Sequence, residues 1–544
     1  MNRLGLAAVA AAALWVAACS SGGGSTITPP PPAGNYSLAS LSGTYAFMTN
    51  GRVITNTATG PAESPLARVG SFFADGMGHI TGGVEDVNAN GAVSSAIFFN
   101  NTSSYTVNPD GRGTLTLDLT ANGIPATINF AIVLTSGKAG TAPANDGLMI
   151  DETSTANQAS TGSGNFILQN TSSFQTSLLT GTYTFDFFGL DSGGAPESII
   201  GEFSASAGGI TSGFEDANDN FALTNGPTGV GSFTSDPQNS GTLSSFGRGL
   251  ATIAGETYAF YIVDPTSRVR LISIGTSTAT PPMLTGDAIL QSNIPASISA
   301  INGGFAFLVG GSDFAGNGLV RVGRLTATGA TLSKLLMDVN DNASETQLNT
   351  LSNGTISTYD PATGRGMLSF NSATATFTFV FYLSSQNSGV IQEQTVGNTS
   401  IPVDVADGSI LAQTGSPFSG SNIAGTYAMN WSGVVTSNGT QDEEDLVSQV
   451  KVSSLSLSGT SDIFQFTSTT LTPITDIGTK GTITFNGGDG AGDDGKRVDM
   501  TVNLSGASPI KMVVYIVNPQ LAFFINTNQS GAPRIVAGIL KAQQ

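Results

Sequence analysis

The residues that most suggest chemistry are the oxygen-bearing side chains Asp86, Asn88 and Asn90, on alternate positions directly before Gly91. A calcium loop begins in this way, because calcium takes about six to eight oxygen ligands. An EF-hand loop would have a glutamate at its twelfth position, but residue 97 is isoleucine. A structural turn and a calcium site of another kind both remain open, here and at the matching residues Asp216, Asn218, Asp338 and Asn340.

The strand expected before this loop has apolar residues with a period of two. Ile80, Gly82, Val84 and Asp86 would share one face, because side chains alternate along a strand. We therefore expect Asp86 on the core side, at the rim where the strand ends, accepting hydrogen bonds from N–H groups of the turn. Asn88 and its counterparts suit a left-handed turn conformation.

Candidate catalytic groups are few. Glu85 and Asp86 resemble the carboxylate pair of a glycosidase, but such a pair faces across a substrate, whereas neighbours on a strand point to opposite faces. His79 is the single histidine, in a glycine-rich turn where we expect it to be exposed. The acidic run Gly487 to Gly495 favours a solvated hairpin tip over a calcium loop. We expect no enzymatic activity and no cofactor, with calcium as the alternative.

A second repeated element is the sequence Gly-Arg-Gly around Arg112, Arg248 and Arg365. Leucine and phenylalanine side chains alternate away from these arginines, so the arginines are expected on the outer face or at the rim. They would contact a ligand or partner, or form an ion pair with a local acid such as the rim aspartate of the same unit. The last part of the chain departs from the pattern and has Lys496 and Arg497 instead.

The N-terminus reads as an export signal. Residues 1–18 contain one cation, Arg3, and then an apolar run that ends at Cys19, the single cysteine. The stretch Val16 to Cys19 resembles the lipobox of bacterial lipoproteins, which implies lipidation of Cys19 and a palmitate-bearing membrane anchor; an ordinary secretory signal is the alternative. Residues 19–40 are rich in Gly, Ser and Pro and form a tether. We expect localisation in the bacterial cell envelope, at the outer membrane.

Composition indicates an all-β protein with several domains. The chain has 544 residues, of which 10% are charged, with 69 glycines and 30 phenylalanines. The net charge is −19 and the isoelectric point is near 4.2. A nucleic-acid partner is not expected, because phosphate binding needs clustered cations.

The chain repeats itself. The motif "LSGTYAF" at Leu41 returns in related form at Leu179, Ile301 and Ile423, and each unit closes on a similar strand that ends in glutamine. Nine residues separate each of the first three closing glutamines from the next unit (170–178, 292–300 and 414–422). This predicts tandem copies of one domain, with boundaries at 41–170, 179–291, 301–413 and 423–544.

Each unit reads as about eight short strands joined by turns, which suits an up-and-down antiparallel barrel, with a two-sheet sandwich as the alternative. The first unit should contain strands at 43–47, 67–74, 78–86, 95–107, 113–119, 126–134, 147–152 and 164–169. Bulky residues are expected to fill the barrel: Phe47, Phe72, Val84, Leu115, Leu117, Phe130 and Phe166.

The opening "GTY" and the following "GSFFADGMGHITGG" resemble the calycin group, which includes lipocalin- and avidin-type barrels. The chain also resembles tandem-repeat lipoproteins of bacterial envelopes without an assigned activity. The calycin resemblance implies binding of a small molecule inside the barrel. Tyr45, Tyr183, Phe305 and Tyr427 stand where lipocalins have tryptophan.

Two classes of function follow. The first is a lipid-anchored, non-catalytic surface for adhesion or scaffolding, formed by spaced barrels, whose partner is an envelope or surface protein or a glycan. The second is binding of a small apolar ligand inside one or more barrels. Trp431 and the acidic run at Gln441 to Leu446 mark the last unit as the most divergent, which suits a terminal cap or a distal contact surface.

Overall fold

The computed structural model describes residues 35–544, except 58–59, 122–123, 139, 156–157, 237–242, 244, 276–279, 349–350, 396–403, 416–417, 438–439, 466–472, 486–496 and 528–532. The export signal, Cys19, Lys496 and the acidic run Gly487 to Gly495 lie outside the described residues. No helix among the described residues is long and apolar enough to span a bilayer.

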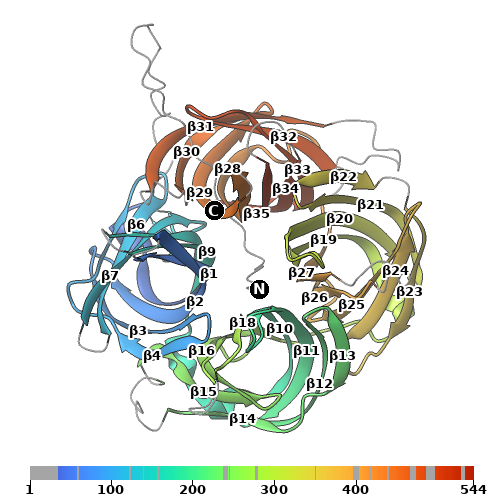
Figure 1. Cartoon of the computed structure of the whole chain (residues 1–544), viewed down its shortest axis with the longest axis horizontal. Helices are drawn as coiled ribbons and strands as arrows, with labels where there is room; N and C mark the ends of the chain where they lie inside the picture. The colour runs from blue at the N-terminus through green and yellow to red at the C-terminus, as the bar shows by residue number, and fades with distance from the viewer. Residues whose placement is uncertain are drawn as a thin grey trace, which may run out of the picture.

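The described chain forms four β-barrels arranged in a closed ring (Figure 1). The barrels follow one another around the ring in chain order, and the fourth lies against the first. The predicted fold class, all-β with four tandem antiparallel barrels of about eight strands, is confirmed. The barrels are packed together, so the expectation of spaced units is wrong.

Barrel 1 is an up-and-down meander in which β4 is a hairpin arm that pairs with β3, outside the barrel wall. The wall closes where β3 approaches β5, through the bridge between His79 and Ser104 and the hydrogen bond from Ile80 N–H to Ser103 O. Its strands are β1 (Ser42–Thr57), β2 (Gly60–Asp75), β3 (Ile80–Ala89), β4 (Ala92–Phe98), β5 (Ser104–Val107), β6 (Arg112–Ala121), β7 (Ile124–Leu134), β8 (Asp146–Ser154) and β9 (Gln158–Leu168).

Barrel 2 repeats this plan, with β13 as the arm. Its strands are β10 (Gly181–Leu190), β11 (Pro196–Ser206), β12 (Gly209–Asp219), β13 (Ala222–Pro227), β14 (Gly231–Thr234), β15 (Arg248–Ile253), β16 (Glu256–Asp264), β17 (Arg268–Ser273) and β18 (Met283–Leu290). Short 3-10 turns precede the barrels: η1 (Leu38–Ser40), η2 (Thr171–Ser173), η3 (Thr176–Leu178) and η4 (Ile298–Ala300).

Barrel 3 has the arm β22, and barrel 4 is a closed barrel of eight strands. The strands of barrel 3 are β19 (Asn302–Ser312), β20 (Gly318–Thr328), β21 (Thr331–Asp341), β22 (Ser344–Leu348), β23 (Ser352–Tyr359), β24 (Arg365–Asn371), β25 (Thr376–Leu383), β26 (Ser388–Glu393) and β27 (Val405–Ala412). Those of barrel 4 are β28 (Gly425–Ser437), β29 (Thr440–Ser453), β30 (Ser456–Gln465), β31 (Ile474–Thr484), β32 (Arg497–Leu504), β33 (Ile510–Asn518), β34 (Leu521–Asn526) and β35 (Arg534–Ala542).

Each barrel has its own apolar core, built from the inward residues of its strands. In barrel 1, all the predicted core residues except Val84 lie in this core, and Phe47, Phe72 and Phe166 pack ring against ring. A cavity inside barrel 4 measures only about 20 Å³, which is roughly the room one water needs. Barrel 4 is thus filled by side chains, and barrels 1 to 3 contain apolar cores of the same kind.

Val84 is the exception because a β-bulge interrupts the alternation in β3. Phe73 of β2 pairs with Gly82, but the next residue, Ala74, pairs with Ile80. The extra residue in β3 reverses the face of the sheet to which each later side chain of this strand points. Ile80 therefore points into the barrel, whereas Val84 packs in an apolar cluster shared with barrel 2. Bulges also occur at the corresponding pairings of β11 with β12 and of β20 with β21.

Candidate functional site: the junctions between barrels

The strand that carries Asp86 brings this carboxylate out of barrel 1 and against barrel 2. Asp86 is fully buried and accepts hydrogen bonds from Arg248 Nε at 2.8 Å and Nη2 at 2.9 Å. The hydroxyl of Tyr261 donates to the same carboxylate at 2.6 Å, and Ser95 of the arm β4 donates at 2.5 Å. The predicted core-side position of Asp86 is wrong, because the bulge turns the end of β3 outward.

The next two junctions repeat this arrangement. Between barrels 2 and 3, Asp216 accepts from Arg365 Nε at 2.7 Å and from the Tyr382 hydroxyl at 2.6 Å. Between barrels 3 and 4, Asp338 accepts from Arg497 Nε at 2.9 Å and from the Tyr515 hydroxyl at 2.5 Å. In each case a second guanidinium nitrogen bonds the other carboxylate oxygen, which is the two-pronged geometry that only arginine offers.

These contacts revise the prediction for the Gly-Arg-Gly arginines. Their position on the outer face is confirmed, and a local acid is indeed bound by two of them, since Arg112 contacts Asp110 and Arg248 contacts Asp236. The rim aspartate that each arginine binds belongs to the preceding barrel of the ring and not to the same unit. Arg497 occupies the position of Arg365 in barrel 4, so the last barrel keeps this contact although its local sequence departs from Gly-Arg-Gly. The ion pairs therefore fix each barrel against its neighbour.

The asparagines two residues later also lie between barrels. Asn88, Asn218 and Asn340 are fully buried in strands. The amide of Asn88 donates to the backbone oxygens of Ser273 at 3.0 Å and Pro282 at 2.9 Å, both in barrel 2. Asn218 and Asn340 donate to the following barrel in the same way. The left-handed turn expected here is wrong for these residues; it falls instead on Asn90, whose φ is 50°.

The closing glutamines, which mark the repeat in the sequence, bind the backbone of the following barrel. Gln169 donates from Nε2 to Ile262 O of barrel 2 at 2.6 Å, and Gln413 donates to Ile516 O of barrel 4 at 2.7 Å. Gln291 makes the same bond to Leu383 O at 2.9 Å. Their recurrence at the end of every closing strand is the sequence signal that could have indicated this role.

The fourth junction closes the ring between barrels 4 and 1. Gln543 donates to Leu134 O of barrel 1 at 2.8 Å, and the backbone N–H of Gln544 donates to Thr135 O. Arg112 of barrel 1 contacts Asp462 at 3.0 Å and Asp476 at 2.6 Å in barrel 4, and Asp110 of its own barrel at 3.1 Å. The first and last barrels are thus joined by the same classes of contact as barrels joined by a linker.

Burial and charge shape the protonation of these groups. Burial lowers the pKa of the Arg248 guanidinium, but its hydrogen bonds and ion pair with Asp86 outweigh burial and raise the pKa above its usual value. Burial, followed by the charge of Asp86, raises the pKa of the Tyr261 hydroxyl well above its usual value. The arginines therefore stay charged and the tyrosines stay hydrogen-bond donors.

The rim aspartates are already occupied by protein donors. Arg248, Tyr261 and Ser95 take both oxygens of Asp86. Over the part of the chain that the structure describes, no group of three or more His, Cys, Asp or Glu side chains is arranged to hold a metal ion. The chemistry of these residues is charge pairing between barrels, and we expect no calcium dependence at Asp86.

Two other predicted features are also placed. The imidazole of His79 is 67% exposed and its Nδ1 lies 2.9 Å from Asp75 Oδ2, which confirms the exposed turn.

Trp431 is buried in the core of barrel 4, and the acidic run lies in β29 with Glu443, Glu444 and Asp445 buried. Asp445 accepts a hydrogen bond from Thr161 of barrel 1 at 2.7 Å. The run is part of the closing junction, so its expected role as a distal surface is wrong.

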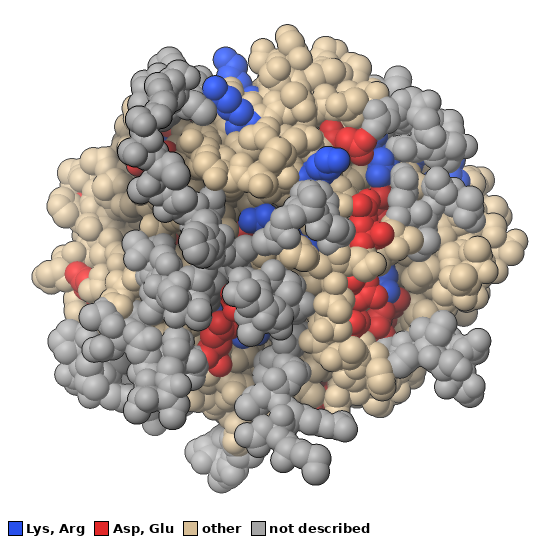
Figure 2. Space-filling model, turned by 45° about the horizontal axis from the view of Figure 1, so that its top comes forward, with Lys and Arg blue, Asp and Glu red and all other residues tan. Residues whose placement is uncertain are grey.

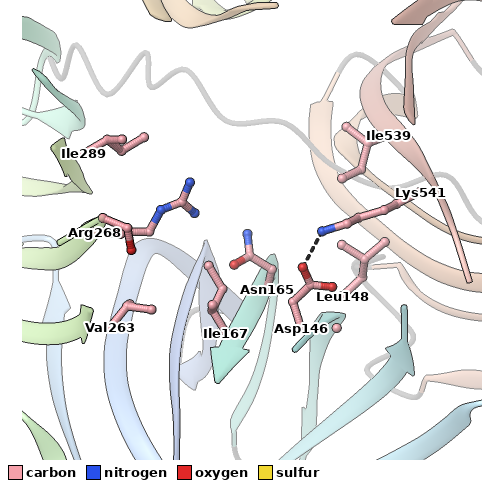
Figure 3. Close-up of a pocket in the computed structure, with 11 residues that line it drawn as sticks. Asp146, Leu148, Asn165, Ile167, Val263, Arg268, Ile289, Ile539 and Lys541 are labelled. Carbon is pink, nitrogen blue, oxygen red and sulfur yellow. Dashed lines mark hydrogen bonds and ion pairs between the residues drawn. The ribbon is translucent and has the colours of Figure 1, made fainter. Parts of the chain in front are cut away.

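The closing strands β9, β18 and β35, with the neighbouring strands β8 and β17, line a hollow towards the axis of the ring (Figure 3). Two adjoining cavities of about 390 and 590 Å³ share Arg268, Ile289, Ile539 and Lys541. Both cations have partners, since Arg268 lies 3.2 Å from Asp287 and Lys541 lies 2.5 Å from Asp146. The hollow is thus lined by two paired cations together with apolar side chains such as Ile167, Ile289 and Ile539.

Charge is sparse on the surface. Figure 2 shows a face in which most described side chains are neither acidic nor basic, and the charged ones lie close together in a few places. Many acids are buried in the junctions and at the ends of the barrels: Glu85, Asp86, Asp151, Glu152, Asp216, Asp338, Glu393, Glu443, Glu444 and Asp445. The net charge of −19 therefore overstates the acidity of the surface.

The geometry defines a closed ring of four eight-stranded antiparallel barrels. No protein-family model matches the chain, and no curated protein matches it by sequence. Among solved structures, it is similar to Transferrin Binding Protein B of Haemophilus parasuis, with 10% identity, 76% of this chain and 85% of that chain covered, and a TM-score of 0.22.

An AttH protein of Nitrosomonas europaea is similar at 8% identity, with 68% of this chain and 92% of that chain covered and a TM-score of 0.17. Intact Ap-TbpB, with its N and C lobes, is similar at 12% identity, with coverage of 73% and 83% and a TM-score of 0.14. These likenesses are too weak to transfer a residue, ligand or partner to this chain.

Proposed function

We propose that this protein is a lipid-anchored protein of the bacterial cell envelope, at the outer membrane, whose ring of barrels is a rigid, non-catalytic module for adhesion or scaffolding. The observation that carries the proposal is the use of the recurring Asp, Arg, Tyr and Gln residues as ties between barrels. The Asp, Arg and Gln residues repeat in all four units and the tyrosine in three, and they serve the assembly of one platform. The apolar cores give no support to a ligand inside the barrels.

The anchor follows from the sequence around Cys19. Cys19→Ser should abolish lipid labelling and move the protein from the membrane fraction to the soluble fraction of the envelope. Asn108→Ala, which changes an exposed turn residue and keeps Cys19, is the control and should remain in the membrane fraction. A wild-type protein without lipid label would overturn the anchor.

The surface where a partner binds is expected at the barrel ends near the β2–β3 and β13–β14 turns. Large apolar side chains are exposed there, with Met77 at 68% and Val230 at 79% exposure. These two side chains are the most exposed large apolar groups of the described residues, which makes them the positions to test for a partner.

Photo-crosslinking in intact cells tests this surface. A photoreactive amino acid at Met77 or Val230 should give a discrete adduct with an envelope protein, a surface protein or a glycan. The same amino acid at Asn108, an exposed turn residue of barrel 1, is the control and should give none. Absence of adducts at both test positions would contradict the proposal.

A further inference from the structure

A cavity separate from the hollow of Figure 3 lies on the ring axis, and all four barrels contribute to it. Its volume is about 290 Å³. Asn50 and Gly51 of β1 line this cavity, whereas the hollow meets Asn165 and Ile167, which lie near the closing glutamine. The walls are mainly apolar and include Pro65, Phe188, Leu190, Met283, Val320 and Ile535.

The cavity exists because the four barrels differ at one equivalent position. Asn50, Phe188, Gly310 and Ser432 each lie five residues after the opening aromatic residue and face the axis in the same register. Barrel 3 has no side chain at this position. A Cβ built on Gly310 would meet nothing closer than Val320 Cγ1 at 3.8 Å, so the space in front of Gly310 is open.

One part of the cavity wall is polar. Glu443 lines the cavity and is only 4% exposed. Arg52 Nε lies 3.4 Å from Glu443 Oε2 and has no hydrogen-bond acceptor among the described residues, although Arg52 Nη1 bonds Glu63 at 2.8 Å. Arg52 does not itself line the cavity, so the polar end is formed by the Glu443 carboxyl group, which is suited to the hydroxyl group of a ligand.

The volume limits the size of a ligand. A dry apolar cavity of about 150 Å³ accommodates benzene, so the axial cavity has room for roughly ten to twelve non-hydrogen atoms. Pockets lined by apolar side chains with a few polar groups are the usual form of small-molecule sites between domains.

We propose that the axial cavity binds a small aromatic or aliphatic alcohol, with its apolar body against Phe188, Met283 and Ile535 and its hydroxyl group at Glu443. This site lies between the barrels, whereas the resemblance to calycins implied a site inside one. The inference does not depend on the proposed adhesion or scaffolding function, because it concerns the inner wall of the ring and not its outer surface.

Calorimetric titration of the full chain carrying Cys19→Ser with 2-naphthol tests the site. We expect saturable binding at one site, weakened at least tenfold by Gly310→Phe, which fills the open space. The matched control is Gly226→Phe, because Gly226 lies on the arm β13 and a Cβ there meets nothing within 4 Å. This control should bind as the parent protein does.

A second variant covers the case in which Gly310→Phe fails to fold. Glu443→Gln keeps the size of the side chain and a polar oxygen beside Arg52. It should weaken binding of 2-naphthol severalfold while leaving naphthalene binding unchanged, because only the carboxyl contact with the hydroxyl group is altered. No binding by the parent protein, or equal binding by the parent and Gly310→Phe, would overturn the site. So would an equal loss of both ligands in Glu443→Gln.

Discussion

The three junctions that follow a linker differ from the one that closes the ring. At each linked junction, one buried aspartate binds one arginine through two nitrogens and also accepts a tyrosine hydroxyl. At the closing junction, Val133 stands in place of the tyrosine and Phe464 in place of the asparagine. Arg112 is shared among three carboxylates, whereas Arg248 and Arg497 each contact two among the described residues.

The closing junction compensates with additional ion pairs. Lys541 binds Asp146, and Arg52 lies 3.4 Å from Glu443 across the same pair of barrels. The closing junction also contains several acidic side chains, because Glu152 is buried near Asp462. The Oε1 atom of Glu152 has no hydrogen-bond partner among the described residues. Linked junctions thus use one geometry three times, whereas the closing junction depends on a balance of charges without a covalent link.

The largest expected effect is the loss of Arg112. Arg112→Ala leaves Asp110 and Asp462 buried without their cation, which typically costs about 3 to 5 kcal/mol. Because no linker joins barrels 4 and 1, we expect the ring to open, with an increase in the radius of gyration by small-angle X-ray scattering. Arg248→Ala should lower the melting temperature comparably, but residues 170–178 still hold barrels 1 and 2 together. An unchanged scattering curve for Arg112→Ala would contradict the comparison.

The same junction should make ring closure depend on pH, with a change that is gradual in each pH unit. Burial, followed by the charges of Asp462 and Asp151, raises the pKa of Glu152 from 4.5 to about 9, although Arg112 acts in the opposite direction. A raised pKa stabilises the closed ring below the pKa of the free group, and this stabilisation is lost as the pH rises towards about 9. The loss is at most about 1.4 kcal/mol per pH unit.

We therefore expect the open fraction to increase between pH 5 and pH 9 in scattering experiments, and Glu152→Gln should reduce this dependence. Asp476, which is largely exposed, and Asp462 also face this region. If Glu152→Gln leaves the pH dependence of the open fraction unchanged, that dependence belongs to Asp462 or Asp476, and the role of Glu152 is refuted.

A smaller effect is expected from the tyrosine that the closing junction lacks. Tyr261→Phe removes the hydroxyl that donates to Asp86 but keeps the ring, so it should cost about 1.5 to 3 kcal/mol, typical of a hydrogen bond to a charged group. Chemical denaturation measures this change. Tyr45→Phe, which loses a bond to the carbonyl of Ala144 within barrel 1, is the control and should cost less. If Tyr261→Phe and Tyr45→Phe lower the free energy of unfolding equally, the junction tyrosine has no special role.

The smallest expected effect concerns calcium. Because Arg248 and Tyr261 occupy Asp86, millimolar calcium should leave the melting temperature of the wild type unchanged, while Asp86→Ala should melt lower with or without calcium. A rise of several degrees with calcium in the wild type alone would show an ion site by mass action.

Several features of the fold could be predicted from local patterns. Alternation of side chains predicted the strands and the inward Phe47, Leu115 and Phe130, because period two is set by the backbone itself. The spacing of "GTY" openings and closing glutamines predicted four units. One strand expected at 95–107 is in fact two, β4 and β5, because the arm leaves the barrel wall before the wall resumes.

The site was not predictable in the same way. The sequence by itself determined the all-β class, the four repeats and the set of recurring residues Asp86, Arg248 and Gln169 with their counterparts. Only the tertiary structure decided their partners, because the bulge in β3 reverses the face of Asp86 and each ion pair joins residues of different barrels. The ring closes only if the rotations from each barrel to the next add up to a full turn, and no local sequence pattern encodes that sum. Only this closure brings Gln543 into contact with Leu134.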